Sequence, residues 1–152
     1  LGPERRPQIV LTGSAVGFYG DRGAEPCTEE SPPGPAEDFL AQLCVRWEEE
    51  TRVAESLGVR LVLLRIGIVL GDGGGMLAKM VPPFRAFVGG PLGSGRQFVS
   101  WVHIDDVIGL LELALERSTL SGPLNVTAPR PVRMSELAKT LCEVLHRPAR
   151  LS

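Results

Sequence analysis

The sequence has little of what marks several classes of protein. Of its 152 residues only Lys79 and Lys139 are lysines, and with a net charge of −2 it holds no basic block that could neutralise the phosphates of a nucleic acid. It has no apolar run long enough to span a bilayer, and its first residues, LGPERRPQIV, lack the apolar core of a signal peptide. We therefore expect neither a nucleic acid nor a membrane as a partner.

Cysteine and tyrosine are also scarce, with three residues of the first and one of the second. Cys27, Cys44 and Cys142 lie far apart and form no CxxC pair. This spacing is typical of reduced thiols in a cytoplasmic protein and favours neither a disulfide framework nor a zinc site. We therefore predict no metal site.

The N-terminal half predicts a parallel strand–helix–strand unit. β-branched and aliphatic residues form a strand over Gln8–Gly13 that stops at Ser14, and a proline-rich loop follows. Residues 36–57 repeat apolar side chains at intervals of three and four, which predicts a helix that Gly58 ends. Residues 59–71, VRLVLLRIGIVLG, are almost continuously apolar, as in a strand buried on both faces of a parallel sheet.

The C-terminal half predicts shorter elements. After GDGGG the pattern indicates a helix through Met80, broken by Pro82 and Pro83, and then a strand in RQFVSWV. HIDDVIGLLELALE predicts a helix with Asp105 as its cap, GPLNVTA a short strand, and MSELAKTLCEVLHR a final amphipathic helix.

These strands are too few to complete a doubly wound sheet, which needs about five or more. We therefore predict an α/β fold that is the C-terminal half of a Rossmann-type doubly wound parallel sheet, with substrate-side elements added. In this prediction residues 1–152 are one partial domain, 8–71 form its strand–helix–strand core, and 72–152 form the substrate-side segment and the terminal strand and helices.

Ser14, at the end of the first strand, has two chemical interpretations. A nucleophile elbow needs the pattern G-x-S-x-G and a following helix, but Gly13 directly precedes Ser14 and a proline-rich loop follows. The histidines, His103 and His146, are not placed for a triad. We therefore expect Ser14 to hydrogen-bond a ligand at the carboxyl edge of the sheet, where α/β proteins bind ligands.

Three other features have a structural and a functional interpretation. The run GGGMLA, residues 73–78, formally matches a dinucleotide-binding glycine pattern, but the short helix after it favours a flexible loop. The group His103, Asp105 and Asp106 could bind a metal, but acids at the start of a helix are favoured by capping and by the helix dipole. Arg65, inside an apolar strand, either pairs with a carboxylate or reaches a ligand, and we favour the pair.

Several segments, taken in order, carry a family resemblance. They are SAVGFYG, RWEEE, LRIGIVLGDGGGMLAKMVPPFR, GGPLGSGRQFVSWVHIDD and LNVTAPRPVRMSELAKTL. From Ile9 onward the chain resembles the extended short-chain dehydrogenase/reductases. Within them it is similar to an atypical, epimerase-like branch of NAD(P)-dependent oxidoreductases that is related to the nucleoside-diphosphate-sugar epimerases.

The resemblance implies a nicotinamide cofactor, NADP or NAD. It also implies that the glycines that hold the cofactor's pyrophosphate lie upstream of Leu1, in an N-terminal half that this chain lacks. The cofactor-binding candidates fall into two groups. Ser14 and Ala15 would lie near the nicotinamide, and its far side would be lined by Arg65, Ile66, Gly67 and Ile68.

The sequence departs from the family pattern at two places. The stretch DFLAQLCVRW, where the family has its acid/base pair Tyr-x-x-x-Lys, contains neither residue. Val99 stands where epimerases place an arginine that grips the diphosphate of a nucleotide sugar. The catalytic candidates are therefore Ser14 and Tyr19, and the substrate-binding candidates are Arg85, Arg96 and Trp101.

Tyr19 is the chain's one phenol, and its ring either packs in the turn after the strand or reaches the pocket as a proton donor. With these residues we predict an NAD(P)-dependent oxidoreductase or epimerase-like protein acting on an unknown small substrate. The alternative is a catalytically silent NAD(P)-binding sensor or interaction protein.

Overall fold

A computed structural model describes residues 6–147, and these fall into two compact units. The first unit contains the residues up to Gly67 together with Asp105–Val126. The second contains Ile68–Ile104 and the residues from Thr127 onward. The first unit therefore takes most of a helix and a strand from the second half of the chain.

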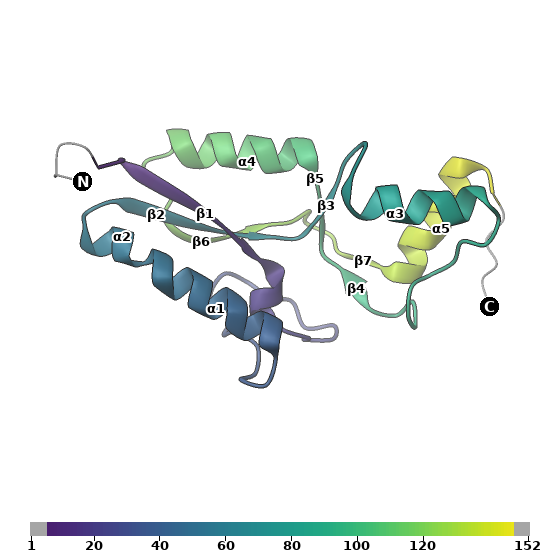
Figure 1. The fold of residues 1–152 in the computed structure, drawn as a ribbon, viewed down its shortest axis with the longest axis horizontal. Helices are drawn as coiled ribbons and strands as arrows, with labels where there is room; N and C mark the ends of the chain where they lie inside the picture. The colour runs from purple at the N-terminus through teal and green to yellow at the C-terminus, as the bar shows by residue number, and fades with distance from the viewer. Residues whose placement is uncertain (1–5, 148–152) are drawn as a thin grey trace. The chain divides into compact units, whose positions relative to one another are not determined.

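The first unit is a three-stranded parallel sheet with helices on both faces. Strand β2 (Arg60–Ile66) lies in the middle, between β1 (Ile9–Ala15) and β6 (Gly122–Val126). Figure 1 shows α1 (Phe39–Thr51) on one side of the sheet and α4 (Ile104–Glu116) on the other. Every residue of β2 from position 61 to 65 is buried, which confirms the strand predicted to be covered on both faces.

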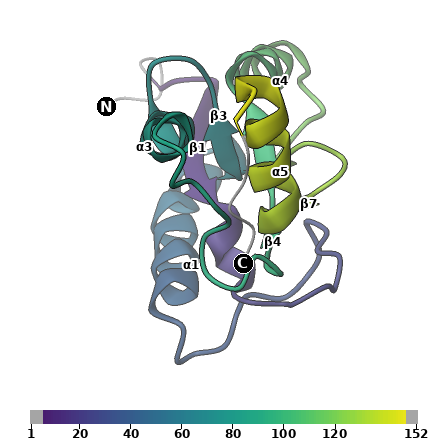
Figure 2. The same cartoon turned by 90° about the vertical axis from the view of Figure 1, so that its right-hand side faces the viewer.

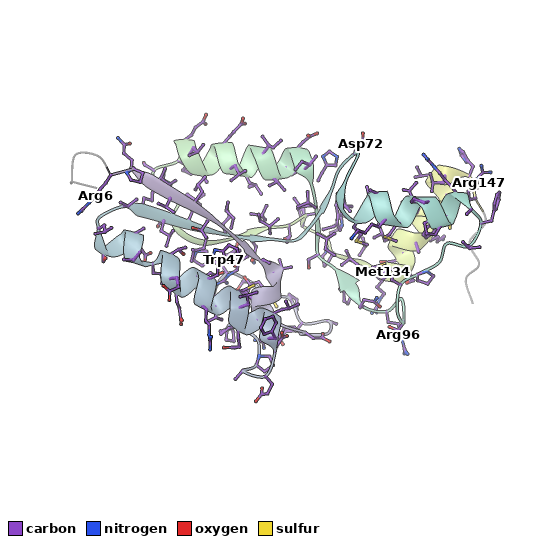
Figure 3. The ribbon with its side chains drawn as sticks, in the orientation of Figure 1. Arg6, Trp47, Asp72, Arg96, Met134 and Arg147 are labelled. Atoms are coloured by element: carbon purple, nitrogen blue, oxygen red, sulfur yellow. The ribbon has the colours of Figure 1, made fainter. Side chains whose placement is uncertain are left out.

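The predicted helix over 36–57 is present as two pieces. Asp38 caps α1, its side chain accepting hydrogen bonds from the backbone N–H groups of Leu40 and Ala41. The short helix α2 (Val53–Ser56) follows, and Gly58 ends it with a φ of +74°, as the sequence predicted. The large apolar side chains of α1 are mostly exposed in the described residues, and Trp47 is labelled in Figure 3.

A tight turn joins β1 to the loop that follows it. β1 runs into a short 3-10 helix, η2 (Val16–Tyr19), and the backbone N–H of Gly34 then donates to the carbonyl of Phe18 over 2.8 Å. A Cβ atom on Gly34 would lie 2.9 Å from the Cα of Gly20 and 2.8 Å from the Cβ of Ala41. The close approach of these two backbone segments therefore requires glycine at position 34.

In its described residues the second unit holds two small sheets and two helices. Strand β3 (Ile68–Leu70) pairs in parallel with β5 (Trp101–His103), and β4 (Phe98–Val99) pairs antiparallel with β7 (Val132–Arg133). In Figure 2 the helices of this unit, α3 (Gly75–Arg85) and α5 (Met134–Leu145), are nearest the viewer. Figure 3 labels Met134 at the start of α5. The buried core of this unit consists of Met80, Phe84, Val99, Met134, Ala138 and Cys142.

Two segments predicted as single strands are each divided between sheets. The apolar run 59–71 breaks at Gly67, whose N–H donates to the carbonyl of Val126 in the first unit. The next N–H, from Ile68, donates to the carbonyl of Ser100 in the second unit. RQFVSWV breaks at Ser100 into β4 and β5. Apolar periodicity could not reveal these breaks, because the residues on both sides of each break are apolar.

Two predicted helix boundaries were also wrong. The helix predicted to stop at Met80 continues through Pro82 and Pro83 to Arg85. Each proline leaves the carbonyl four residues earlier without its helical partner, but those carbonyls belong to residues 78 and 79, which are exposed to water.

The helix α4 begins at Ile104, so Asp105 and Asp106 lie within its first turn, where the helix dipole favours acids. Asp105 is therefore not the cap residue that the sequence predicted. No helix among the described residues is long and apolar enough to cross a membrane.

We predict that Gly34→Ala destabilises the intact protein by about 1–3 kcal/mol, because the new methyl group overlaps backbone that cannot move aside. Gly109→Ala is the matched control, since a Cβ there meets nothing within 4 Å and the position lies inside α4. It should stabilise by up to about 1 kcal/mol through helix propensity. Urea unfolding measures both, and a neutral Gly34→Ala would contradict the close approach.

Candidate functional site

Three polar side chains form a row across the carboxyl end of the first unit's sheet. Ser14 of β1 is in register with Arg65 of β2, and Arg65 is in register with Asn125 of β6. Residues in register on parallel strands point to the same face of a sheet. The row faces α1, because Ser14 and Arg65 both bond to Glu48 of that helix.

The centre of this row is a buried ion pair. The Nε of Arg65 donates to Oε1 of Glu48 and Nη2 donates to Oε2, each over 2.9 Å. Arg65 is 3% exposed and Glu48 is 2% exposed. Burial by itself lowers the pKa of Arg65, but hydrogen bonds to Glu48 and Tyr19 and the charge of Glu48 outweigh it, so the pKa is raised.

Ser14 is tied to the same carboxylate. Its hydroxyl lies 2.8 Å from Oε1 of Glu48 and donates to it, while the side chain stays only half-buried at the edge of the sheet. Ser14 is therefore one of the residues of this network that stays partly accessible at the carboxyl edge of the sheet. Its orientation is fixed by Glu48, and Arg65 fixes Glu48.

Tyr19 lies on the other side of Arg65. Its hydroxyl accepts a hydrogen bond from Nη1 of Arg65 over 3.0 Å and donates to Oδ1 of Asn125 over 2.6 Å. The ring is 4% exposed. The guanidinium of Arg65 lies over the ring of Phe18, with Cζ 3.4 Å from the ring centroid.

The proline-rich loop completes the network through Glu29. Its backbone carbonyl accepts from Nη1 of Arg65 over 3.2 Å, and its carboxylate accepts from the backbone N–H of Asn125 over 2.8 Å. Among the described residues no buried side-chain nitrogen or oxygen lacks a hydrogen-bond partner. The buried polar side-chain atoms of the network are thus all hydrogen-bonded within the protein.

The structure separates the remaining cofactor candidates. Ala15 and Ile66 are neighbours in register at the ends of β1 and β2, and with Gly67 they are half-buried in the first unit. Strand alternation turns the side chains of Ala15 and Ile66 to the face opposite Ser14. Ile68 belongs to the second unit and is 37% exposed.

The three substrate candidates all belong to the second unit. Arg85 is exposed in the last turn of α3, and Arg96 projects outward from the loop before β4 (Figure 3). Trp101 is half-buried, and its indole N–H donates to the carbonyl of Arg130 over 3.2 Å. Val99 is 3% exposed in the core of that unit, so its side chain meets no ligand.

Sequence reasoning missed Glu48, Asn125 and Glu29. A signal for Glu48 was present, because a buried arginine demands an acid and Glu48 lies seven residues after Ala41, on the same face of α1. Ala41 is fully buried, and Glu48 shares that buried face. Asn125 and Glu29 gave no comparable signal, since their role depends on how a late strand and a loop meet.

Comparisons with known proteins identify the family and the fold of this chain. The model of the NAD dependent epimerase/dehydratase family matches residues 3–126. The Arabidopsis thaliana protein named "Epimerase family protein SDR39U1 homolog, chloroplastic" is 45% identical over 146 residues, which are 96% of this chain and 41% of that protein.

Two solved structures are also similar. The human epimerase family protein SDR39U1, isoform 2, with NADPH, is 38% identical with a TM-score of 0.86, over 94% of this chain and 48% of that one. The nucleoside-diphosphate sugar epimerase of Corynebacterium glutamicum is 36% identical with a TM-score of 0.81, over 94% of this chain and 35% of that one. The described fold is thus the Rossmann-type α/β fold, and the chain spans less than half the length of these relatives.

We predict that Glu48→Gln destabilises the intact protein by about 3–5 kcal/mol, because it leaves the guanidinium of Arg65 buried without a counter-charge. Glu49→Gln is the control, since it is the same substitution at the next position of α1, which is exposed. It should change stability by less than about 0.5 kcal/mol. Equal effects in urea unfolding would contradict a buried pair.

Proposed function

This chain belongs to the NAD dependent epimerase/dehydratase family, and from that premise we propose that it is part of an NAD(P)-dependent oxidoreductase or epimerase-like protein that acts on a small molecule. The observation that carries the proposal is Ser14, a half-buried hydroxyl at the carboxyl end of a parallel strand, held by a buried ion pair. Fixing one hydroxyl in this way orients a ligand before any reaction occurs.

The residues at the ends of β1 and β2 fit a nicotinamide ring. Ala15, Ile66 and Gly67 are half-buried and offer small or aliphatic surface with peptide groups, which suits a flat ring of low polarity. When bound, the cofactor supplies or accepts a hydride. Arg65 contributes its position in the strand and not its side chain, because the guanidinium is occupied by Glu48, Tyr19 and the carbonyl of Glu29.

Between the two dinucleotides we propose NADP(H). The support is the human relative, 38% identical, whose structure contains NADPH. The substrate contacts that we propose from the second unit are Arg85, Arg96 and Trp101.

A second candidate function is binding without turnover, as a sensor or interaction protein. It is favoured by the state of Tyr19, whose hydroxyl is buried and already accepts from Arg65 and donates to Asn125. No Tyr-x-x-x-Lys pair replaces it in the sequence. Hydride transfer to a carbonyl needs a proton donor within hydrogen-bond reach of the substrate oxygen.

Calorimetric titration of the intact protein with NADPH and NADH tests the cofactor. We expect micromolar or tighter binding of NADPH and weaker binding of NADH. Incubation of the NADPH complex with a library of carbonyl compounds then separates the two functions. An enzyme reduces some of these compounds and oxidises NADPH, whereas a sensor binds NADPH and leaves it unoxidised. Absence of binding by either dinucleotide would refute both.

UDP-sugars are expected not to stabilise the intact protein against heat, because Val99, where a diphosphate-gripping arginine would stand, is buried in a core. A tight ligand raises the melting temperature by mass action. NADPH serves as the positive control in the same scan. If UDP-glucose does raise the melting temperature, Arg96→Ala and Arg85→Ala will identify which exposed arginine holds the diphosphate.

A further inference from the structure

The polarity of the Ser14 hydroxyl follows from the charge of Glu48. A guanidinium in a protein keeps its proton, so Arg65 is a cation although it is buried. Its other hydrogen-bond partners are neutral, namely the hydroxyl of Tyr19 and the backbone carbonyl of Glu29. Among the described residues the one carboxylate in ion-pair contact with Arg65 is that of Glu48, which is therefore ionised.

An ionised carboxylate only accepts hydrogen bonds. The 2.8 Å contact between the Ser14 hydroxyl and Oε1 of Glu48 therefore uses the single proton of Ser14. Two lone pairs remain on the Ser14 oxygen, in a side chain that is half-buried at the carboxyl edge of the sheet. An isolated serine could rotate to donate or to accept, whereas this one is held in the accepting state.

We propose that Ser14 acts as an obligate hydrogen-bond acceptor, so that the ligand group it contacts is an N–H or O–H donor and not a carbonyl oxygen. This inference rests on the proposed function for the identity of the ligand. Two donors have this chemistry there, the amide N–H of the nicotinamide carboxamide and the hydroxyl of an alcohol substrate. A carbonyl ligand would have to break the bond to Glu48, and a hydrogen bond to a charged group is worth roughly 10- to 100-fold in an equilibrium constant.

Glu48 is thus a positioning residue for Ser14, and Arg65 holds Glu48 in place through two hydrogen bonds of an ion pair. The arrangement gives Arg65 a purpose beyond structure, although its side chain never reaches a ligand. The guanidinium of Arg65 and the hydroxyl of Ser14 are linked through the carboxylate of Glu48, which accepts a hydrogen bond from each.

Neutron diffraction from crystals of the deuterated intact protein tests the polarity without any ligand. We expect deuterium density on the Ser14 oxygen along the line to Glu48, and none on either oxygen of Glu48. Deuterium on Glu48, or a Ser14 deuteron that points to solvent, would overturn the proposal. This result is independent of cofactor binding, so it stands or falls separately from the proposed function.

Binding measurements then distinguish the two donors. NADP⁺ carries the carboxamide N–H donor, whereas its 3-acetylpyridine analogue has a methyl group in that place. The ratio of the affinities for NADP⁺ and for the analogue is measured in wild type and in Ser14→Ala, which loses the acceptor. If the cofactor is the donor, this ratio should be about 3- to 10-fold larger in wild type than in Ser14→Ala. Ser14→Thr keeps a hydroxyl and should restore the wild-type ratio.

If the two proteins show the same ratio, the donor belongs to the substrate. The NADP⁺ complex is then titrated with cyclohexanol, and the NADPH complex with cyclohexanone. Wild type should favour the alcohol over the ketone, relative to Ser14→Ala, by a similar factor. Equal preferences of wild type and Ser14→Ala in both comparisons would overturn the proposal, even with the expected neutron result, because Ser14 would then contact no donor.

Discussion

An arginine side chain inside a parallel sheet must find its counter-charge within the fold, and the way Arg65 does so organises the first unit of this chain. Its guanidinium bonds to Glu48 on α1, to Tyr19 on η2 and to the backbone of Glu29 in the loop. Through these partners Ser14 on β1 and Asn125 on β6 are drawn into the same network. One buried charge therefore connects all three strands with the helix and the loop that cover their ends.

The energetics of this network are those of a completed set, in which each member is needed. Moving an ion pair out of water costs several kcal/mol per ion, and close geometry with further hydrogen bonds offsets much of that cost. Both oxygens of Glu48 are used, and the face of the guanidinium rests on Phe18. Such a pair adds little to stability relative to an apolar core, but it fixes directions that apolar contacts leave free.

For function, the consequence is that most polar groups at this edge of the sheet are already engaged with one another. Arg65 and Tyr19 are buried and bonded within the protein, so neither side chain is free to act on a ligand. Ser14 and Asn125 are both half-buried at the carboxyl edge, and the proton of the Ser14 hydroxyl is directed to Glu48. We propose that such a site orients a ligand and leaves proton transfer to a group outside the network.

The sequence by itself determined the α/β class, the central buried strand, the main helices and the position of Ser14 at a strand end. Apolar periodicity and turn residues are local signals, and these features depend on them. It also determined that Arg65 needs a partner, because an isolated buried charge is not tolerated. Only the tertiary structure decided that the partner is Glu48, that the run 59–71 divides at Gly67 between two units, and that α3 passes through its prolines. Those outcomes depend on which distant backbone groups and side chains meet, such as Gly67 with Val126 and Ser14 with Glu48, and the composition of a short window carries no record of such meetings.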